Sequence, residues 1–154
     1  MVRAVLSLME RLGRAVTRTV VFGLQGVAIG YCIFEYGIQT SHCTGPSMEP
    51  TIHDGDIIVI EKISAIRNSF KRDDIVVCRS PSEPDSYLCK RLIGLPGDIL
   101  TSPDIGSQEV PRGRVWLQGD NYNNSHDSKD FGPVPMGLLK GRAIFKLNTW
   151  EILR

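Results

Sequence analysis

The sequence has almost no net charge. Its 154 residues hold 18 Lys and Arg against 17 Asp and Glu, which gives a formal net charge of +1. Such a balance provides no basic surface for nucleic acid, so nucleic acid is not an expected partner. The length allows one compact domain with a short added tail and excludes a second large domain.

Several familiar catalytic and metal-binding patterns are also missing. The chain has no G-x-S-x-G, no S-x-x-K with K-T-G, and no H-E-x-x-H. Its cysteines are Cys32, Cys43, Cys78 and Cys89, and no two have C-x-x-C spacing, so no zinc site is expected. Cys78 and Cys89 lie in neighbouring strand-like runs, where a disulfide across a hairpin is possible but two buried thiols are favoured.

The first distinctive feature of the chain is a basic flank in residues 1–18. This flank carries four arginines, Arg3, Arg11, Arg14 and Arg18. The next stretch, 19–37, reads "TVVFGLQGVAIGYCIFEYG" and is nearly uncharged. Its apolar part is marginal for a membrane span of roughly 20 residues, and no A-x-A cleavage site follows, so it predicts a retained anchor. The alternative is the buried core helix of a soluble domain.

The basic flank also has the character of an organellar targeting sequence. The positive-inside rule places its arginines on the inner side of the membrane, and residues 40–154 on the opposite side.

Residues 40–154 are predicted to form a β-rich domain. Short β-branched runs alternate with clusters of Gly, Pro, Asp and Asn; the runs are "DIIVIEK", "DIVVCRS", "YLCKRLIG", "RVWLQG" and "GRAIFKL". Five or six strands without a long amphipathic helix indicate a mainly β fold, either a coiled sheet or a barrel. The segment "SAIRNSFKRDD" predicts a helical turn, whereas "SPSEPDS" and "TSPDIGSQEVPRG" predict loops.

The stretch "TGPSMEPT", residues 44–51, sets a serine between two proline turns. Proline fixes the backbone and glycine permits close approach, so Ser47 can be held rigidly at a surface, as a nucleophile requires. A plain turn fits the same residues. The rest of the chain must therefore supply a base.

Two kinds of base are available. His126 beside Asp127 is the best histidine candidate, although histidines in polar loops are more often solvated. In "YLCKRLIG", strand alternation places Lys90 between Leu88 and Leu92 on one face, where burial favours the neutral amine that a general base needs. The alternative is a solvated Lys90 whose stem rests on these leucines.

A polar loop, "GDNYNNSHDSKDFGPV", covers residues 119–134 and is dense in short hydrogen-bonding side chains. Ser125, Asp127 and Ser128 are candidates to position the lysine amine. Asp127 also fits as a simple turn residue.

Three segments, "GPSMEPTIHDGD", "CKRLIGLPGD" and "GDNYNNSHDSKDFGPV", resemble in order and spacing the conserved boxes of the type I signal peptidases. These are membrane-anchored serine proteases with a Ser-Lys dyad. The resemblance covers about residues 40 to 147. It implies a signal-peptidase-like coiled β-sheet catalytic domain with one N-terminal membrane-anchoring helix.

Residue by residue, the resemblance implies that Ser47 is the nucleophile and Lys90 the general base. Met48 corresponds to the substrate-side strand, and Ser125 and Asp127 to loop residues that orient the lysine. Two departures stand out. Lys129 replaces the usual arginine, which removes a bidentate pairing, and Gly45 stands where some members carry a hydroxyl. The Ser47 N–H is then the main oxyanion donor.

The resemblance implies removal of signal or sorting peptides from imported or exported precursor proteins by acyl transfer, without metal or nucleotide. The short chain, the Arg-rich start and "CKRLIGLPGD" are most similar to the mitochondrial inner membrane members. These imply a location in that membrane, a catalytic domain facing the intermembrane space, and a second protease subunit as partner. One alternative is a catalytically silent peptide-binding or scaffold subunit of a membrane protease complex. A self-cleaving repressor-type protease is disfavoured by the anchor and by the lack of a DNA-binding helix pair.

Overall fold

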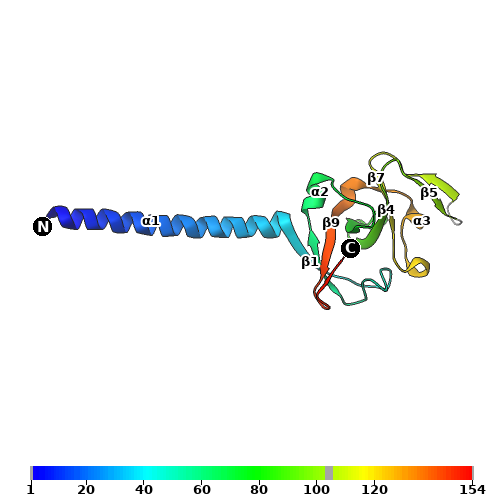
Figure 1. The fold of residues 1–154 in the computed structure, drawn as a ribbon, viewed down its shortest axis with the longest axis horizontal. Coiled ribbons are helices and arrows are strands. Elements are labelled where there is room, and N and C mark those ends of the chain that lie inside the picture. The colour runs from blue at the N-terminus through cyan, green and yellow to red at the C-terminus, as the bar shows by residue number, and fades with distance from the viewer. Residues whose placement is uncertain (1, 103–105, 154) are drawn as a thin grey trace. The chain divides into compact units, whose positions relative to one another are not determined.

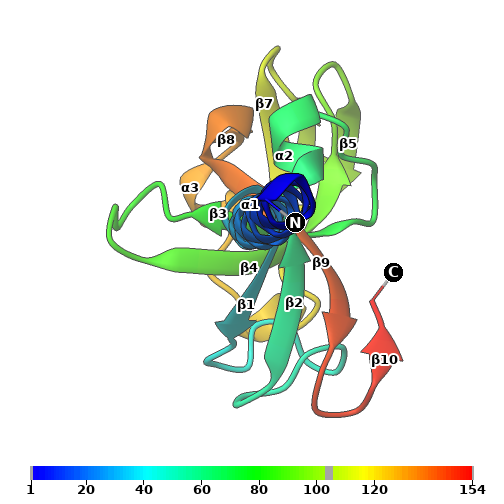
Figure 2. The same ribbon diagram turned by 90° about the vertical axis from the view of Figure 1, so that its left-hand side faces the viewer.

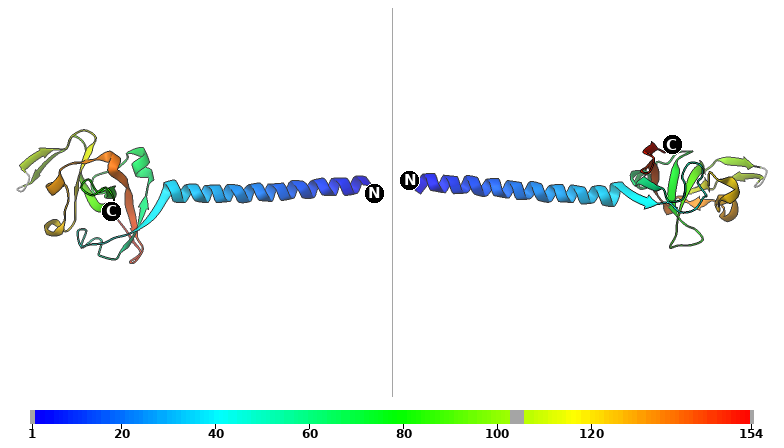
Figure 3. Two further views of the ribbon diagram at one scale, coloured as in Figure 1. Left: turned by 180° about the vertical axis from the view of Figure 1, so that it is seen from behind. Right: turned by 90° about the horizontal axis from the view of Figure 1, so that it is seen from below.

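The computed structural model describes residues 2–102 and 106–153, which divide into two units, Met1–Gly37 and Ile38–Arg154. The first unit is one long helix, α1 (Val2–Cys32), which ends in a short π-helical turn at Ile33–Gly37. Figure 3 shows α1 as a single continuous helix. The basic flank and most of the apolar stretch therefore form one continuous helix, although the sequence suggested two segments.

Helix α1 is long and apolar enough to cross a membrane over Arg11–Gly37, judged by length and composition. These 27 residues rise about 40 Å as an α-helix, more than the roughly 30 Å of a bilayer hydrocarbon core. No residue from Arg11 to Gly37 is buried, and Leu24 and Val27 are 66% and 72% exposed.

The second unit is built on a curled antiparallel sheet (Figures 1 and 2). Its strands are β1 (Ile38–His42), β2 (Ile57–Glu61), β3 (Ile75–Arg79), β4 (Tyr87–Gly94), β7 (Arg114–Gln118), β8 (Val134–Pro135), β9 (Leu139–Lys146) and β10 (Glu151–Ile152). They follow the order β1-β2-β9-β3-β4-β7-β8, and β10 pairs with β9. Register shifts between Val59 and Ile60, and between Val77 and Cys78, bend the sheet, as β-bulges do. The mainly β fold is confirmed.

Strand β9 comes late in the sequence but lies in the middle of the sheet. It pairs with β2 on one side and with β3 on the other. The half of the sheet that carries β1 and β2 is therefore joined to the half that carries β3 and β4 through β9.

Strand β3 is buried on both faces, and its alternation divides the core in two. Val76 and Cys78 face one hydrophobic cluster, and Ile75 and Val77 face the other. The first cluster is completed by Phe70, Leu92, Val115, Leu117, Val134 and Leu139. The second is completed by Met48, Ile52, Ile58, Ile60 and Ala143.

The remaining elements are short. A helical turn, α2 (Ile63–Arg67), lies where the sequence predicted one, and 3-10 turns cover Tyr122–Asn124 and Met136–Leu138. One further helical turn, α3 (Ser128–Phe131), lies within the polar loop.

The prediction of a loop at "TSPDIGSQEVPRG" is wrong in part. Strands β5 (Ile99–Ser102) and β6 (Gly106–Glu109) form a two-stranded antiparallel sheet, and residues 103–105 between them lie outside the described residues. Every residue of β6 is exposed, so this strand carries no alternation of apolar and polar residues that would reveal it.

Candidate active site

The loop around Ser47 is fixed at several points. Gly45 has a positive φ of 88°, and its N–H donates to Asp54 Oδ1 at 2.8 Å. The Ser47 carbonyl accepts from the Asn121 N–H at 3.1 Å, and the Pro46 carbonyl accepts from the Asn121 side-chain amide at 3.1 Å. The backbone of Ser47 is therefore tied to the polar loop.

Lys90 lies in β4 opposite Val76 of β3 and is only 3% exposed. Leu88 and Leu92 pack against the same hydrophobic cluster, which confirms that they share a face. Burial lowers the pKa of Lys90, and the negative charge of Asp127 opposes this only in part. No ion pair to Lys90 is formed by any residue in 2–102 or 106–153.

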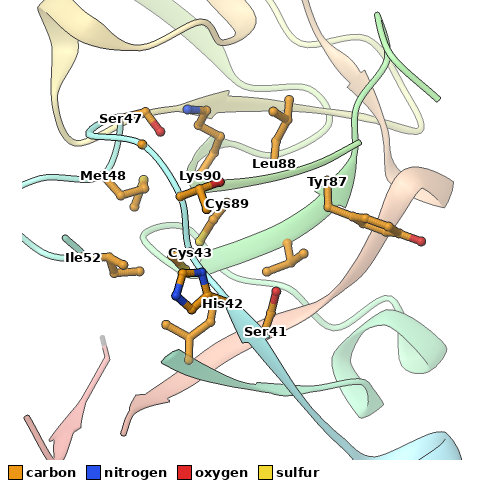
Figure 4. Close-up of a pocket in the computed structure, with 14 residues that line it drawn as sticks. Ser41, His42, Cys43, Ser47, Met48, Ile52, Tyr87, Leu88, Cys89 and Lys90 are labelled. Carbon is orange, nitrogen blue, oxygen red and sulfur yellow. The ribbon is translucent and has the colours of Figure 1, made fainter. Parts of the chain in front are cut away.

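Ser47 and Lys90 line one cavity of about 130 Å³. Figure 4 shows the Lys90 amine directed toward the Ser47 hydroxyl. Residues 41–48 form one wall and residues 87–90 the other, with Ile52, Ile58 and Val77 completing the lining. Met48 is buried in the wall beside Ser47.

Asp127 organises the polar loop from a fully buried position. Its carboxylate accepts from the Ser125 hydroxyl at 2.7 Å, the Gly119 N–H at 2.9 Å and the Lys129 N–H at 3.2 Å. Its own N–H donates to Asp130 Oδ2 at 3.1 Å, which completes a capping box at the start of α3. Asp127 is thus far more than a solvated turn residue.

Gly119 is the point where this loop meets Ser47. A Cβ at this position would overlap both the Ser125 side chain and the Ser47 carbonyl oxygen. Only glycine permits such close approach. The structure therefore brings Ser47, Ser125 and Asp127 to one place.

Sequence reasoning did not identify a set of hydrogen bonds in which Asp120 joins Arg91 to Thr51. Arg91 donates from Nε and Nη2 to the two carboxylate oxygens of Asp120 at 2.8 and 2.7 Å. The Thr51 hydroxyl donates to Asp120 Oδ2 at 2.5 Å. Because Thr51 follows Ser47 and Arg91 follows Lys90, Asp120 links both segments to the polar loop. The sequence contains both partners, in the Lys-Arg pair and in "GDN", but nothing in the local pattern shows that Arg91 and Asp120 meet.

The histidine alternative receives little support from the geometry. His126 is not among the residues that line the cavity; its side chain is 66% exposed and lies 3.1 Å from Asp130. His42 does line the cavity, but Figure 4 shows it at the opposite end from Ser47. Of these candidates, Lys90 is the one whose amine is directed toward Ser47.

All four cysteines are free thiols, so Cys78 and Cys89 form no disulfide. Cys78 lies opposite Leu88 and packs in one hydrophobic cluster, whereas Cys89 lies opposite Val77 and packs against the other. The thiol nearest to Cys89 in function is that of Cys43, since both residues line the cavity and each shifts the pKa of the other.

Comparison with known proteins places this geometry in a family. Residues 16–104 and 100–150 match the family described as "Signal peptidase, peptidase S26". Mitochondrial inner membrane protease subunit 1 of Homo sapiens is 47% identical over 135 residues, which cover 84% of this chain and 81% of that protein. The protein of the same name from Xenopus tropicalis is 41% identical over 136 residues, 85% of this chain and 80% of its own length. Mitochondrial inner membrane protease subunit 2 of Danio rerio is 37% identical over 117 residues, 70% and 64% of the two chains. The chain therefore belongs to the signal peptidase family, peptidase S26, and its resemblance to mitochondrial inner membrane protease subunit 1 is confirmed.

Proposed function

We propose that this chain is a membrane-anchored serine endopeptidase that removes signal or sorting peptides from precursor proteins, with Ser47 as nucleophile and Lys90 as general base. One observation carries the proposal: a buried lysine without an ion-pair partner among the described residues shares a cavity with a serine on a fixed turn. A lysine of lowered pKa supplies the neutral amine that can activate a hydroxyl.

The reaction is acyl transfer. The Lys90 amine takes the proton of the Ser47 hydroxyl while Oγ attacks the peptide carbonyl carbon. Collapse of the tetrahedral intermediate breaks the peptide bond, and the Lys90 ammonium returns the proton to the leaving amine. Lys90 then takes a proton from water, and the resulting hydroxide attacks the carbonyl carbon of the acyl-enzyme. Collapse of this second tetrahedral intermediate breaks the ester bond and releases the carboxylic acid product, while the Lys90 ammonium returns its proton to Ser47 Oγ.

The Ser47 N–H is the donor best placed to stabilise the oxyanion. No acceptor for it is found within residues 2–102 and 106–153, so it is available to the substrate. Such donors act most strongly when they are fixed before the reaction, and the Asn121 hydrogen bond fixes the Ser47 carbonyl.

An extended precursor segment fits between the two walls of the cavity. Met48 and the apolar residues beside it would contact the substrate side chains nearest the scissile bond. Ser125 and Asp127 act as positioning residues, since their hydrogen bonds hold the loop against Ser47 and the Asp127 charge lies near Lys90.

Residues 19–37, which comprise the last part of α1 and the π-helical turn after it, form the membrane anchor in this proposal. Residues 1–18 are the basic flank on the inner side and residues 40–154 the peptidase domain. The names of the relatives support the mitochondrial inner membrane as its location and a second protease subunit as its partner. The intermembrane space as the side of the peptidase domain rests on the positive-inside rule applied to the basic flank.

Peptide cleavage by membranes containing the full chain tests the proposal. Wild type should cleave a precursor peptide, Ser47→Ala and Lys90→Arg should be inactive although folded, and His126→Ala and His42→Ala should retain activity. A folded Lys90→Arg enzyme with near-normal turnover would exclude the dyad. A wild-type chain that binds the peptide without cleaving it, even with its partner subunit, would instead identify a silent binding subunit.

A further inference from the structure

Two thiols meet within the cavity, one from each wall. Cys43 follows β1 and precedes the Ser47 loop, and Cys89 is the residue immediately before Lys90 in β4. Both side chains line the cavity. Figure 4 shows the Cys89 sulfur directed toward Cys43.

The backbone holds both cysteines in place. The Cys43 N–H donates to the Asp56 carbonyl at 2.8 Å, and its carbonyl accepts from the Gly55 N–H at 3.0 Å. Cys89 pairs with Val77 in the β3–β4 ladder. Because the two thiols face one cavity from opposite walls, a disulfide with a sulfur–sulfur distance of about 2.05 Å would join these walls directly.

The two thiols differ in reactivity. Interaction with the Cys89 thiol lowers the pKa of Cys43, whereas that interaction and burial raise the pKa of Cys89. Cys43 is therefore the attacking thiol and Cys89 the resolving one. Cys78 differs from both, because burial raises its pKa to about 12 and it is fully enclosed by the core.

We propose that Cys43 and Cys89 form an oxidisable dithiol within the substrate cavity, and that its conversion to a disulfide closes this cavity to peptide. The site takes low-molecular-weight disulfides as oxidants. The effect of the disulfide on cleavage rests on the peptidase function proposed above, whereas formation of the disulfide does not depend on that function.

The reaction balances with glutathione disulfide as oxidant. The Cys43 thiolate attacks one sulfur of glutathione disulfide, forms a mixed disulfide and releases one glutathione thiolate, which takes up the Cys43 proton. The Cys89 sulfur then attacks the Cys43 sulfur, forms the protein disulfide and releases the second glutathione, which takes up the Cys89 proton. Two electrons pass from the protein to the oxidant.

The disulfide would lower activity by holding the two walls of the cavity together. It would link the segment before Ser47 to the strand that carries Lys90, so the walls could no longer separate around a peptide. A displacement of about 1 Å at a catalytic site can cost a hundredfold in rate, so a fixed wall should lower turnover at least about tenfold.

The test uses the full chain in detergent micelles, with its partner subunit where activity requires one. The protein is incubated with glutathione disulfide, alkylated and mapped by peptide mass, and cleavage is measured before oxidation, after oxidation and after dithiothreitol. We expect a peptide linked through Cys43 and Cys89, lowered cleavage, and recovery with dithiothreitol. Cys89→Ser should trap a glutathione adduct on Cys43, Cys43→Ser should leave Cys89 unmodified, and Cys32→Ser should still form the bridge.

Peptide binding provides a readout that does not need catalysis. The Ser47→Ala chain should bind a fluorescent precursor peptide when reduced and at least about tenfold more weakly when oxidised. Absence of the linked peptide, or a bridge that leaves peptide binding unchanged, would overturn the proposal. A reduced wild type that binds but does not cleave refutes the peptidase function alone, since mass mapping and binding still report on the thiol pair.

Discussion

At the scale of single residues, the proposed mechanism makes the pH dependence of cleavage follow the protonation state of the Lys90 amine. Burial lowers its pKa from the ordinary lysine value of about 10.4, and only the neutral amine acts as base. We therefore expect kcat/KM to rise with pH through this lowered pKa and to level off before the ordinary lysine range. A pH profile of peptide cleavage measures this. A rise centred near the unperturbed histidine pKa that disappears in His42→Ala would assign the base to His42.

The same burial means that a charged Lys90 lowers the free energy of unfolding. Between the lowered pKa of Lys90 in the folded protein and its higher pKa in the unfolded chain, the unfolded chain binds more protons, so the free energy of unfolding rises with pH. At pH values below the folded pKa, Lys90 is charged in both states, and the full cost of burying this charge destabilises the folded protein. Lys90→Met should be inactive and more stable by about 1 kcal/mol at pH 7, because it removes a buried charge. Urea unfolding of the two proteins at several pH values checks this, and the difference should shrink as the pH rises.

Asp127 and Asp130 provide a matched pair in one loop. Asp127→Ala leaves the Ser125 hydroxyl and the Gly119 N–H without their buried acceptor, which should cost about 2 to 3 kcal/mol of stability and most of the activity. Asp130 is exposed and contributes to a helix cap, so Asp130→Ala should cost about 1 kcal/mol or less. Turnover and urea unfolding of both variants are the measurements. Equal, small effects on turnover would remove Asp127 from the site.

At the scale of elements, the site depends on two loops meeting at Gly119. Gly119→Ala would force a methyl group into the Ser47 carbonyl and the Ser125 side chain, so turnover should fall at least about a hundredfold. Gly137→Ala is the control, since a Cβ there meets open space. A Gly119→Ala enzyme with the turnover of Gly137→Ala would show that the contact does not position Ser47.

The elements differ in how far the sequence could predict them. β2, β3, β4, β7 and β9 were predicted because each contains β-branched or other apolar residues in a short run bounded by turn-forming residues. β1 and β6 were missed because exposed polar strands carry no apolar periodicity.

The residues of the candidate site also differ in how far the sequence could predict them. Ser47, Lys90 and Asp127 stand in recognisable local motifs, and the structure brings them together. The contacts of Arg91 with Asp120 and of Cys43 with Cys89 depend on which strands and loops become neighbours. Short-range patterns contain no information on such pairing.

At the scale of the whole molecule, attachment to the membrane depends on the apolar length of α1. Replacing Leu24 and Val27 with lysine should cost about 2.5 to 3.5 kcal/mol of insertion free energy for each residue near the centre of the span. We expect the wild-type chain to resist carbonate extraction and the double variant to be released. Lysine at exposed Ile66 and Tyr87, in the second unit, is the control and should leave extraction unchanged. Release of the wild type by carbonate would refute the anchor.

The central position of β9 also has a consequence for the order of biosynthesis. Until β9 has been made and inserted between β2 and β3, no backbone ladder connects the strand pair beside Ser47 to the strand pair that carries Lys90. In a nascent chain that has not yet reached residue 139, only the polar-loop contacts of Asn121 and Asp120 would join the Ser47 segment to β4. Full peptidase activity should therefore appear only after β9 has been synthesised and inserted into the sheet.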